Sequence, residues 1–501
     1  MLDFYNPRLK RGYNIRLAIG LVLVAIVLIL ATLILALITA GYSIDHKNGQ
    51  VYQNGLVFAN SHPVSANIYI NNTPFGTTNA RLELPEGAYT FVLRKTGYDN
   101  WNNSFNLYGG NVLQLDYPFL FPSKPVVTNV QTFASQPDIV SESPNQHWLV
   151  CSVPSKFGSF EVYDVTNPKA APTSFTLPTS VFSNTTGNLS VVEWSTDNQH
   201  ILIKNTFAGG FEYILVDRLN PQNSFNITQL FSTTPFDTVR LDNKQFNKFY
   251  LYNSATGTLS VASVSGQTVT PALTNVLGFW PYSSNELVYA TPDKTNPALV
   301  DAKLLIGTDS YTLRTLPVGS NYLLNIASYN GNSYVTVGSS GTNKVYVYMN
   351  PQANVSPNSL ILPVPYTFLI VNGVPQAVTF STSAESIAVQ AGSEFAVYDI
   401  MTQTHYHYDT KLPLAGQELS QWMDGDRLTL ASNGKLDIFD FDGTNMVTFT
   451  DDNGVFSPAF DSAFDAVYTM TPSTTTPGAW NLIRTSLIVP PPTTSSSKTS
   501  S

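Results

Sequence analysis

The stretch VVEWSTDNQHILI, residues 191–203, decides the fold class of most of this chain. An apolar segment ends at Trp194, the polar residues 195–199 follow, and a second apolar segment covers residues 201–203. Short apolar segments separated by turn-forming residues indicate β-strands joined by tight turns. A third segment, residues 211–217, follows and ends at Asp217. The stretch therefore predicts a series of short antiparallel strands.

Similar units recur along the chain at a spacing of roughly 45 residues. The clearest cover residues 143–164, 378–399 and 421–440, and fainter copies begin near Val239, Gly278, Leu324 and Ser457. This spacing is typical of propeller blades, each built of four short strands. Because residues 235–330 are degenerate, the units number about seven or eight. We therefore expect a seven- or eight-bladed β-propeller over residues 121–489.

A further strand is expected near residues 126–130, before the first repeat. Pairing of this strand with the last blade would close the ring and leave no exposed edge. The cadence of the repeats resembles that of periplasmic Tol-system propellers and WD-type propellers, with Asp197-Asn198 and Asp424-Gly425 as the best matches. This resemblance implies a propeller fold and assigns no particular activity.

Residues 55–120 form a separate group of short alternating strands. We expect strands within residues 55–61, 65–72, 80–85, 89–95 and 104–109, with turns at residues 62–63, 71–72, 74–76 and 85–87. In the fourth strand Tyr89, Phe91 and Leu93 share one face, and Val92 makes the other face partly apolar as well. This pattern predicts a small two-layer sandwich.

The segment also carries the motif Pro85-Glu86-Gly87-Ala88, and it resembles a PEGA domain, a family named after this motif. Ser61-His62-Pro63 and residues 95–98 also match the family's pattern. Asn71-Asn72 replaces the usual Asp-Gly turn and Thr77-Thr78 the usual Thr-Pro, but an Asn pair still supplies the positive φ angles of a hairpin. The resemblance implies a surface module for protein or cell-wall contact. Because Pro85 fixes an entry angle and Gly87 frees the backbone, the motif itself is interpreted as a turn, with Glu86 at its solvated tip and not in a catalytic role.

Residues 17–40 form an apolar run of 24 residues without a charged side chain. At about 1.5 Å per residue a helix of this length spans a hydrocarbon core of about 30 Å. The run is longer than the apolar region of a cleaved signal peptide, so it predicts an uncleaved signal anchor. Arg8, Lys10, Arg11 and Arg16 precede it against the single acid Asp3. The positive-inside rule places residues 1–16 in the cytoplasm, and the spacer 41–54 and all later domains outside it.

Composition restricts the partners of the exterior part. The chain has a formal net charge of −9, and because residues 1–16 are basic, the part beyond the helix is more acidic still. Nucleic acid is therefore not expected as a partner. Cys151 is the one cysteine, so no intramolecular disulfide forms, and its apolar neighbours predict a buried structural thiol. Residues 490–501, rich in Pro, Ser and Thr, are expected to be a disordered tail.

Few residue patterns suggest chemistry. His405 and His407 have the spacing of a metal pair on a strand, but a third ligand is not evident, so packed or solvated histidines are preferred. Asp440–Asn445 alternates oxygen-bearing side chains as in a calcium loop, yet it lacks the closing Glu, and a hairpin tip is preferred. Residues 451–454 are interpreted as a second hairpin tip. We therefore predict no metal site and no cofactor.

Three tryptophans, Trp194, Trp280 and Trp422, have the residue type that stacks on sugars, but core positions in blade strands are preferred. No nucleophile elbow, phosphate-binding glycine loop or zinc-protease motif occurs. We therefore predict a non-catalytic envelope protein whose exterior domains bind a protein or a cell-wall glycan. The alternative is an envelope hydrolase or lyase with its site in the propeller channel. A signalling role would need a membrane partner, because 16 cytoplasmic residues are too few for an effector domain.

Overall fold

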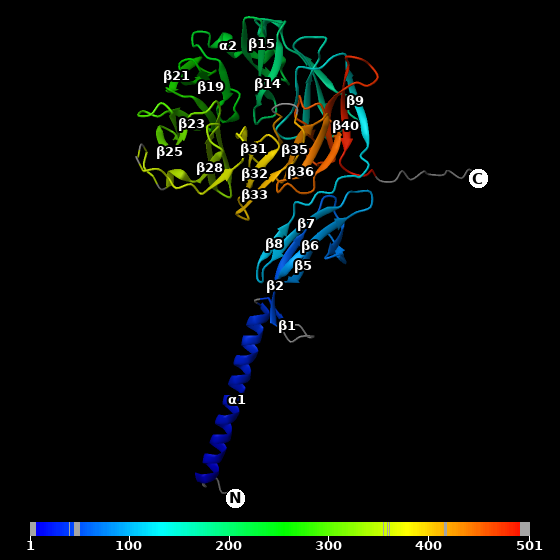
Figure 1. Cartoon of the computed structure of the whole chain (residues 1–501), viewed down its shortest axis with the longest axis vertical. Helices are drawn as coiled ribbons and strands as arrows, with labels where there is room; N and C mark the ends of the chain where they lie inside the picture. The colour runs from blue at the N-terminus through cyan, green and yellow to red at the C-terminus, as the bar shows by residue number, and fades with distance from the viewer. Residues whose placement is uncertain are drawn as a thin grey trace, which may run out of the picture. The chain divides into compact units, whose positions relative to one another are not determined.

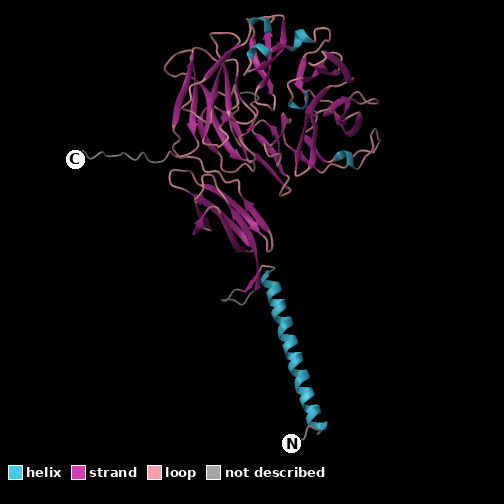
Figure 2. Ribbon diagram, turned by 180° about the vertical axis from the view of Figure 1, so that it is seen from behind, coloured by secondary structure: helices cyan, strands magenta, loops and turns pink. Residues whose placement is uncertain are grey.

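The computed structural model describes residues 7–39, 41–44, 51–353, 355–357, 359, 361–414 and 418–490. The chain divides into two compact units, Met1–Ser123 and Lys124–Ser501. Strands are the main regular secondary structure of both units, and the first unit also contains one long helix (Figures 1 and 2). Residues 491–501, for which a disordered tail is predicted, and parts of the predicted N-terminal segment and spacer lie outside the described residues.

One long apolar helix, α1 (Pro7–Thr39), begins the described chain. It starts well before residue 17, where the apolar run begins, because Pro is favoured at the first helical position and Arg and Lys are good helix formers. Within its segment Tyr13–Thr39, an 18-residue window has a mean hydropathy of 3.4, and none of that window is buried against the rest of the protein. The helix therefore fits a signal anchor or a membrane span.

The first unit contains two four-stranded sheets. One comprises β1 (Tyr42–Ile44), β2 (Val51–Ala59), β5 (Ala80–Pro85) and β8 (Val112–Leu115), and the other β4 (Thr73–Thr77), β3 (Asn67–Ile70), β6 (Gly87–Arg94) and β7 (Trp101–Leu107). Both sheets contribute to one core, in which Phe91 and Leu93 of β6 meet Val57 of β2. The predicted two-layer sandwich is confirmed. Strand β8, which pairs with β2 in parallel, was not predicted.

The turn predicted at residues 74–76 is wrong. These residues lie inside β4, and the chain reverses instead at Asn71-Asn72, where both φ angles are positive, at 49° and 63°. Two consecutive positive φ angles form the two-residue turn that matches the twist of a hairpin. Pro74 is tolerated within β4 because this strand lies at the edge of its sheet.

The described residues of the second unit form eight four-stranded sheets, which we number one to eight in chain order. Sheets one to four comprise β10 (Val140–Glu142), β11 (Trp148–Ser152), β12 (Ser159–Asp164) and β13 (Thr173–Thr176); β14 (Asn188–Trp194), β15 (His200–Phe207), β16 (Gly210–Asp217) and β17 (Phe225–Asn226); β18 (Thr238–Leu241), β19 (Lys248–Asn253), β20 (Thr258–Ser263) and β21 (Thr268–Leu273); and β22 (Gly278–Ser283), β23 (Glu286–Pro292), β24 (Leu299–Ile306) and β25 (Asp309–Pro317).

Sheets five to eight comprise β26 (Tyr322–Tyr329), β27 (Asn332–Ser339), β28 (Lys344–Met349) and β29 (Thr367–Ile370); β30 (Ala377–Phe380), β31 (Ser386–Ala391), β32 (Glu394–Asp399) and β33 (Thr404–Asp409); β34 (Gln421–Trp422), β35 (Arg427–Ser432), β36 (Lys435–Asp440) and β37 (Val447–Asp451); and β38 (Ala459–Phe460), β39 (Ala466–Pro472), β40 (Trp480–Ser486) and β9 (Val127–Phe133). Short helices interrupt the loops at α2 (Ile227–Leu230), η1 (Thr179–Val181), η2 (Pro221–Asn223), η3 (Asp242–Lys244) and η4 (Pro351–Ala353). The repeats predicted near Val239, Gly278, Leu324 and Ser457 correspond to the first strands of sheets three, four, five and eight.

The sheets stack face to face around a ring (Figure 1). Apolar clusters each span two neighbouring sheets, and one of them joins Leu149 of sheet one to Tyr468 and Leu482 of sheet eight. First strands of neighbouring sheets, such as β22 and β26, contact each other. These strands therefore lie innermost, and the propeller fold predicted from the repeats is confirmed.

Strand β9 closes the ring. It precedes sheet one in the chain, yet it pairs antiparallel with β40 of sheet eight, from Phe133 opposite Trp480 to Val127 opposite Thr485. The strand predicted near residues 126–130 is therefore present in the predicted position. Closure through the start of the repeat domain gives the last sheet its fourth strand and joins the two ends of the ring.

Asparagine forms many of the turns. In Asn330-Gly331 and Asn433-Gly434, which join consecutive strands, the Asn φ angles are 47° and 50° and the Gly φ angles 75° and 74°. Asn is one of the few residues other than Gly that adopt this left-handed region readily. Part of the chain's Asn content therefore follows from its large number of tight turns.

Candidate functional site

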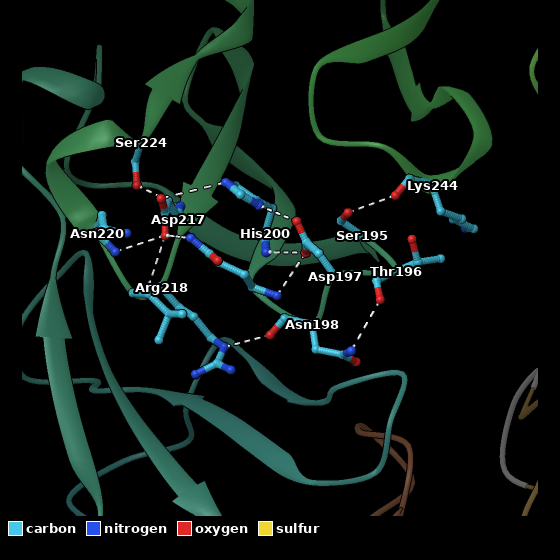
Figure 3. Close-up of polar contacts among 12 residues, drawn as sticks. Ser195, Thr196, Asp197, Asn198, His200, Asp217, Arg218, Asn220, Ser224 and Lys244 are labelled. Carbon is cyan, nitrogen blue, oxygen red and sulfur yellow. Dashed lines mark hydrogen bonds and ion pairs between the residues drawn. The ribbon is translucent and has the colours of Figure 1, made fainter.

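The turn between β14 and β15 holds a buried histidine between two aspartates (Figure 3). His200 Nδ1 lies 2.6 Å from Asp197 Oδ2 in the turn, and His200 Nε2 lies 3.7 Å from Asp217 Oδ2 at the end of β16. The ring of Phe246 stacks on the ring of His200, with 4.0 Å between the ring centroids. The cluster connects the turn to the ends of β15 and β16.

Both aspartates are held in their charged form. Burial opposes the charge of Asp217, but hydrogen bonds from the Asn220 backbone and the Gln199 side chain hold the pKa of its carboxyl below the usual value. Burial also opposes the charge of Asp197, and the backbone N–H groups of His200 and Gln199 lower its pKa. Carboxylates stabilised in this way are poor proton donors at neutral pH.

Sheet seven repeats the arrangement with an arginine in place of the histidine. Arg427 Nε donates to Asp424 Oδ2 at 2.8 Å, and Arg427 Nη1 lies 4.0 Å from Asp440 Oδ1. Arg427 pairs with Asp440 across the strands, as His200 pairs with Asp217. In sheets two and seven, polar residues of the repeat units therefore cross-link neighbouring strands.

Two of the three tryptophans connect first strands of neighbouring sheets. Trp194 is buried, and its Nε1 donates to Ser141 Oγ of sheet one at 2.9 Å. Trp422 is half-buried, and its Nε1 donates to Thr379 Oγ1 of sheet six at 3.0 Å. Trp194 therefore lies in the core as predicted, and Trp422 makes the equivalent contact at a less buried position.

The core position predicted for Trp280 is wrong, because this side chain is 36% exposed. The guanidinium of Arg240 lies 4.6 Å from its ring centroid and so covers one face of the indole. Arg240 Nε also donates to Glu193 Oε1 at 3.0 Å, and Lys244 pairs with the other Glu193 oxygen. Burial opposes the Glu193 charge, but Arg240 and Lys244 hold the pKa of its carboxyl below the usual value.

Replacement of Trp194 and of Trp280 by phenylalanine, one at a time, tests their different environments. Trp194→Phe is expected to lower the free energy of unfolding by about 1–2 kcal/mol, because a buried hydrogen bond is lost. Trp280→Phe is expected to cost less than about 0.5 kcal/mol, because its ring is exposed and phenylalanine still accepts the cation. Urea unfolding of the full chain in detergent, followed by far-UV circular dichroism, measures both values. A larger loss of unfolding free energy for Trp280→Phe than for Trp194→Phe would contradict the exposed position of Trp280 and the buried position of Trp194.

His405 and His407 both lie in β33, the outermost strand of sheet six, but they contact different partners. His405 Nε2 lies 2.9 Å from Thr367 Oγ1, and burial lowers the pKa of this histidine. His407 Nε2 lies 2.5 Å from Glu394 Oε1. Within the described part of the chain, no three His, Cys, Asp or Glu side chains are grouped to hold a metal ion.

Residues 440–445 form the hairpin turn between β36 and β37, as predicted. Gly443 and Asn445 have positive φ angles, and Asn445 Nδ2 donates to Asp440 Oδ2 at 2.9 Å. Asp442 Oδ1 accepts the backbone N–H of Thr444 at 3.0 Å. The alternating oxygen-bearing side chains therefore stabilise the turn itself.

The hairpin predicted for residues 451–454 is wrong, because β37 already completes sheet seven and the chain continues to β38 of sheet eight. The backbone N–H of Asp452 donates to Gly434 of sheet seven, and that of Asn453 donates to Met470 of sheet eight. Asp452 is 2% exposed, and its Oδ2 has no hydrogen-bond partner among the described residues. Burial raises the pKa of Asp452 to about 7.

Two other residues considered in the sequence lie where they were expected. Cys151 in β11 is fully buried, and burial raises the pKa of its thiol well above the usual value. Glu86 is exposed at the bend between β5 and β6. Neither environment is that of an activated catalytic group.

A cavity of about 420 Å³ lies between the outer strands of sheet one and the turn that follows β16 of sheet two. We call it the inter-sheet cleft. It is lined by Val162, residues 173–176, Arg218, Leu219, Pro221 and Gln222. These residues supply hydroxyl groups, an amide, an aromatic ring and one guanidinium. Its volume lies within the range of small-molecule sites, about 300–1,000 Å³.

Arg218 is held in place by Asn198 (Figure 3) and by the ring of Trp148. Its Nε donates to the backbone carbonyl of Asn198 at 2.8 Å, and its guanidinium carbon lies 4.8 Å from the ring centroid of Trp148. The Trp148 ring in turn stacks on His147 at 4.3 Å. A planar guanidinium fixed in this way presents its terminal N–H groups in a defined orientation.

Sequence reasoning missed the inter-sheet cleft. The sequence shows only that Arg218 directly follows Asp217, the residue that ends β16. Its two partners, Asn198 and Trp148, come from a turn of the same sheet and a strand of the neighbouring sheet. No local pattern indicates a contact between residues so far apart in the chain.

Residues 54–120 match the family model of the PEGA domain. No curated protein matches the chain. Similar solved structures include the Dos1 propeller, at 14% identity with a TM-score of 0.44, covering 73% of this chain and 95% of that one. An oligogalacturonate lyase in complex with manganese has 9% identity, a TM-score of 0.39 and coverages of 72% and 98%. Apo AztD from Citrobacter koseri has 13% identity, a TM-score of 0.38 and coverages of 63% and 86%.

Proposed function

We propose that this protein is a membrane-anchored binding scaffold of the cell envelope, which holds a protein or glycan ligand in the inter-sheet cleft. In this proposal α1 is the anchor, and residues 1–16 lie in the cytoplasm because the basic residues before the apolar run favour that side. The PEGA domain and the propeller then lie outside the cytoplasm. The PEGA domain acts as a contact surface near the membrane, and the propeller acts as the platform for the ligand.

The chemistry of the inter-sheet cleft is the observation that carries this proposal. Its lining supplies groups that recognise a ligand: the hydroxyl of Thr173, the ring of Phe175, the Gln222 amide and the fixed Arg218. Among the described lining residues there is no carboxylate, imidazole or thiol to act as a general acid, base or nucleophile. This combination favours binding over catalysis.

The alternative, a hydrolase or lyase, would need ionisable groups free to react near the ring centre. Glu193 lies on an innermost strand, but one of its oxygens accepts from Arg240 and from the Leu241 backbone, and the other pairs with Lys244. Its lowered pKa makes this carboxylate a weak base. Glu193 is therefore not free to react, and the lining of the inter-sheet cleft makes the scaffold the better supported proposal.

Cross-linking on intact cells tests both the orientation and the scaffold. A membrane-impermeant cross-linker is applied to cells that produce the full chain with an affinity tag, and the anchored protein is purified with its adducts. We expect envelope proteins or wall glycan to be recovered, since the propeller faces the reagent. Recovery of no envelope partner, together with turnover of a small molecule by the purified chain, would refute the scaffold and favour the enzyme.

A further inference from the structure

We propose that the inter-sheet cleft binds a neutral saccharide, so that the scaffold's ligand is a glycan without charged groups on the bound units. This inference rests on the proposed function and adds the chemical class of the ligand. Three properties of the cleft lead to it: its hydrogen-bonding groups, its apolar walls and the charges around Arg218.

The hydrogen-bonding groups match a polyhydroxylated ligand. Thr173 is exposed on β13, the outermost strand of sheet one, on the same face as Phe175, and Gln222 lines the cleft from the turn region of sheet two. A hydroxyl group both donates and accepts a hydrogen bond, and the amide of Gln222 offers both functions. Sugar hydroxyls require donors and acceptors side by side, and these residues supply both.

The apolar walls suit the carbon face of a sugar ring. Phe175 stacks on the buried Phe160, at 5.0 Å between ring centroids and an interplanar angle of 21°, so its ring is fixed. Leu219 lines the same cleft and is 59% exposed. An exposed leucine beside a fixed, half-buried ring leaves apolar surface that a ligand can cover.

The charges around Arg218 oppose an anionic ligand. Burial lowers the pKa of Arg218, and the nearby carboxylates of Asp197 and Asp217 offset part of this effect. Both carboxylates are themselves stabilised in the charged form by hydrogen bonds. Two carboxylates against one guanidinium leave this neighbourhood without excess positive charge, and the chain as a whole carries a net charge of −9. Arg218 therefore acts as a fixed hydrogen-bond donor to neutral oxygens.

Titration of defined oligosaccharides tests the proposal. The full chain in lipid nanodiscs is titrated with three tetramers, of glucose, of N-acetylglucosamine and of galacturonic acid, and with an uncharged tetrapeptide. We expect binding of at least one neutral tetramer. Arg218→Met is expected to weaken this binding at least about tenfold. Arg218→Lys is expected to weaken it to a similar extent, because an ammonium group has neither the forked N–H donors nor the planar surface that stacks on Trp148.

A matched control and a second variant guard against loss of folding. Arg314 lies 3.8 Å from the Tyr346 ring centroid in another part of the ring, so Arg314→Met removes a similar stacked arginine and should leave binding unchanged. Thr173→Trp, at an exposed strand position on the face of β13 that lines the cleft, should block the cleft without disturbing the core. Binding of the charged tetramer or the peptide alone would overturn the neutral-saccharide proposal. Binding of no neutral tetramer at millimolar concentration would also overturn it. The scaffold is refuted by a different result, namely recovery of no envelope partner together with turnover of a small molecule.

Discussion

Replacement of Arg427 by methionine is expected to lower the free energy of unfolding by about 3–5 kcal/mol. The guanidinium lies between Asp424 and Asp440, which are 8% and 2% exposed, and Arg427 itself is 6% exposed. Without it, two carboxylates remain buried beside each other with no cation between them, which is costly in a medium of low dielectric constant. Methionine fills a similar volume, so the loss reports on charge more than on packing. Urea unfolding of the full chain in detergent measures it.

Lys435→Met is the matched control, because it removes a cation from an ion pair at the surface of the same sheet. The side chains of Lys435 and Asp451 are 51% and 54% exposed, so water already screens the pair. The expected loss is below about 0.5 kcal/mol. Similar losses in the two variants, or a loss below about 1 kcal/mol for Arg427→Met, would show that Arg427 does not cross-link sheet seven.

The stability of the propeller is expected to fall as the pH rises from about 4 to about 7, because Asp452 must then be charged while buried. The pKa of this carboxyl is raised from 3.8 to about 7 by burial. The folded state therefore binds its proton more tightly than the unfolded state does. The resulting stabilisation is fully present below the unfolded pKa and is lost as the pH rises through the folded pKa.

Asp452→Asn removes this titration and keeps the shape of the side chain. Near pH 8 it is expected to raise the free energy of unfolding above that of the unmodified chain by on the order of 2–4 kcal/mol, and near pH 4 to change it little. Burial also raises the pKa of Glu142, to about 8, so part of the pH dependence remains until Glu142→Gln is added. Unfolding curves at several pH values measure the effect. Parallel pH profiles for the unmodified chain and Asp452→Asn would contradict it.

The sequence predicted those parts of the fold that arise from local patterns. Apolar segments separated by turn residues located the repeats, and the strand near residues 126–130 was expected to close the ring because an open ring leaves unpaired edges. Asn71-Asn72 was expected to supply positive φ angles, and both residues have them. The positions of the strands and turns follow from causes within a few residues, whereas the closure of the ring follows from the general need to pair a strand edge.

Long-range contacts account for what the sequence did not predict. Trp280 lies under Arg240 of the neighbouring sheet and not in the core, and the orientation of Arg218 depends on Trp148 of sheet one. The burial of Asp452 follows from the passage of the chain between two sheets, whereas its sequence resembles an ordinary polar turn. The candidate site was missed for the same reason, since its walls come from two sheets and no motif spans them.

Site-specific photo-cross-linking tests most directly the claim that the anchored propeller holds its ligand in the inter-sheet cleft. A photoreactive amino acid is placed at Thr173, an exposed position on the outer strand of sheet one that lines the cleft, and in a second variant at Thr270, an exposed position on the outer strand of sheet three. Full-length variants are illuminated in their own cells. We expect an envelope adduct from Thr173, reduced by Arg218→Met, and little or none from Thr270. Equal adducts from both positions, or an adduct from Thr270 alone, would contradict it.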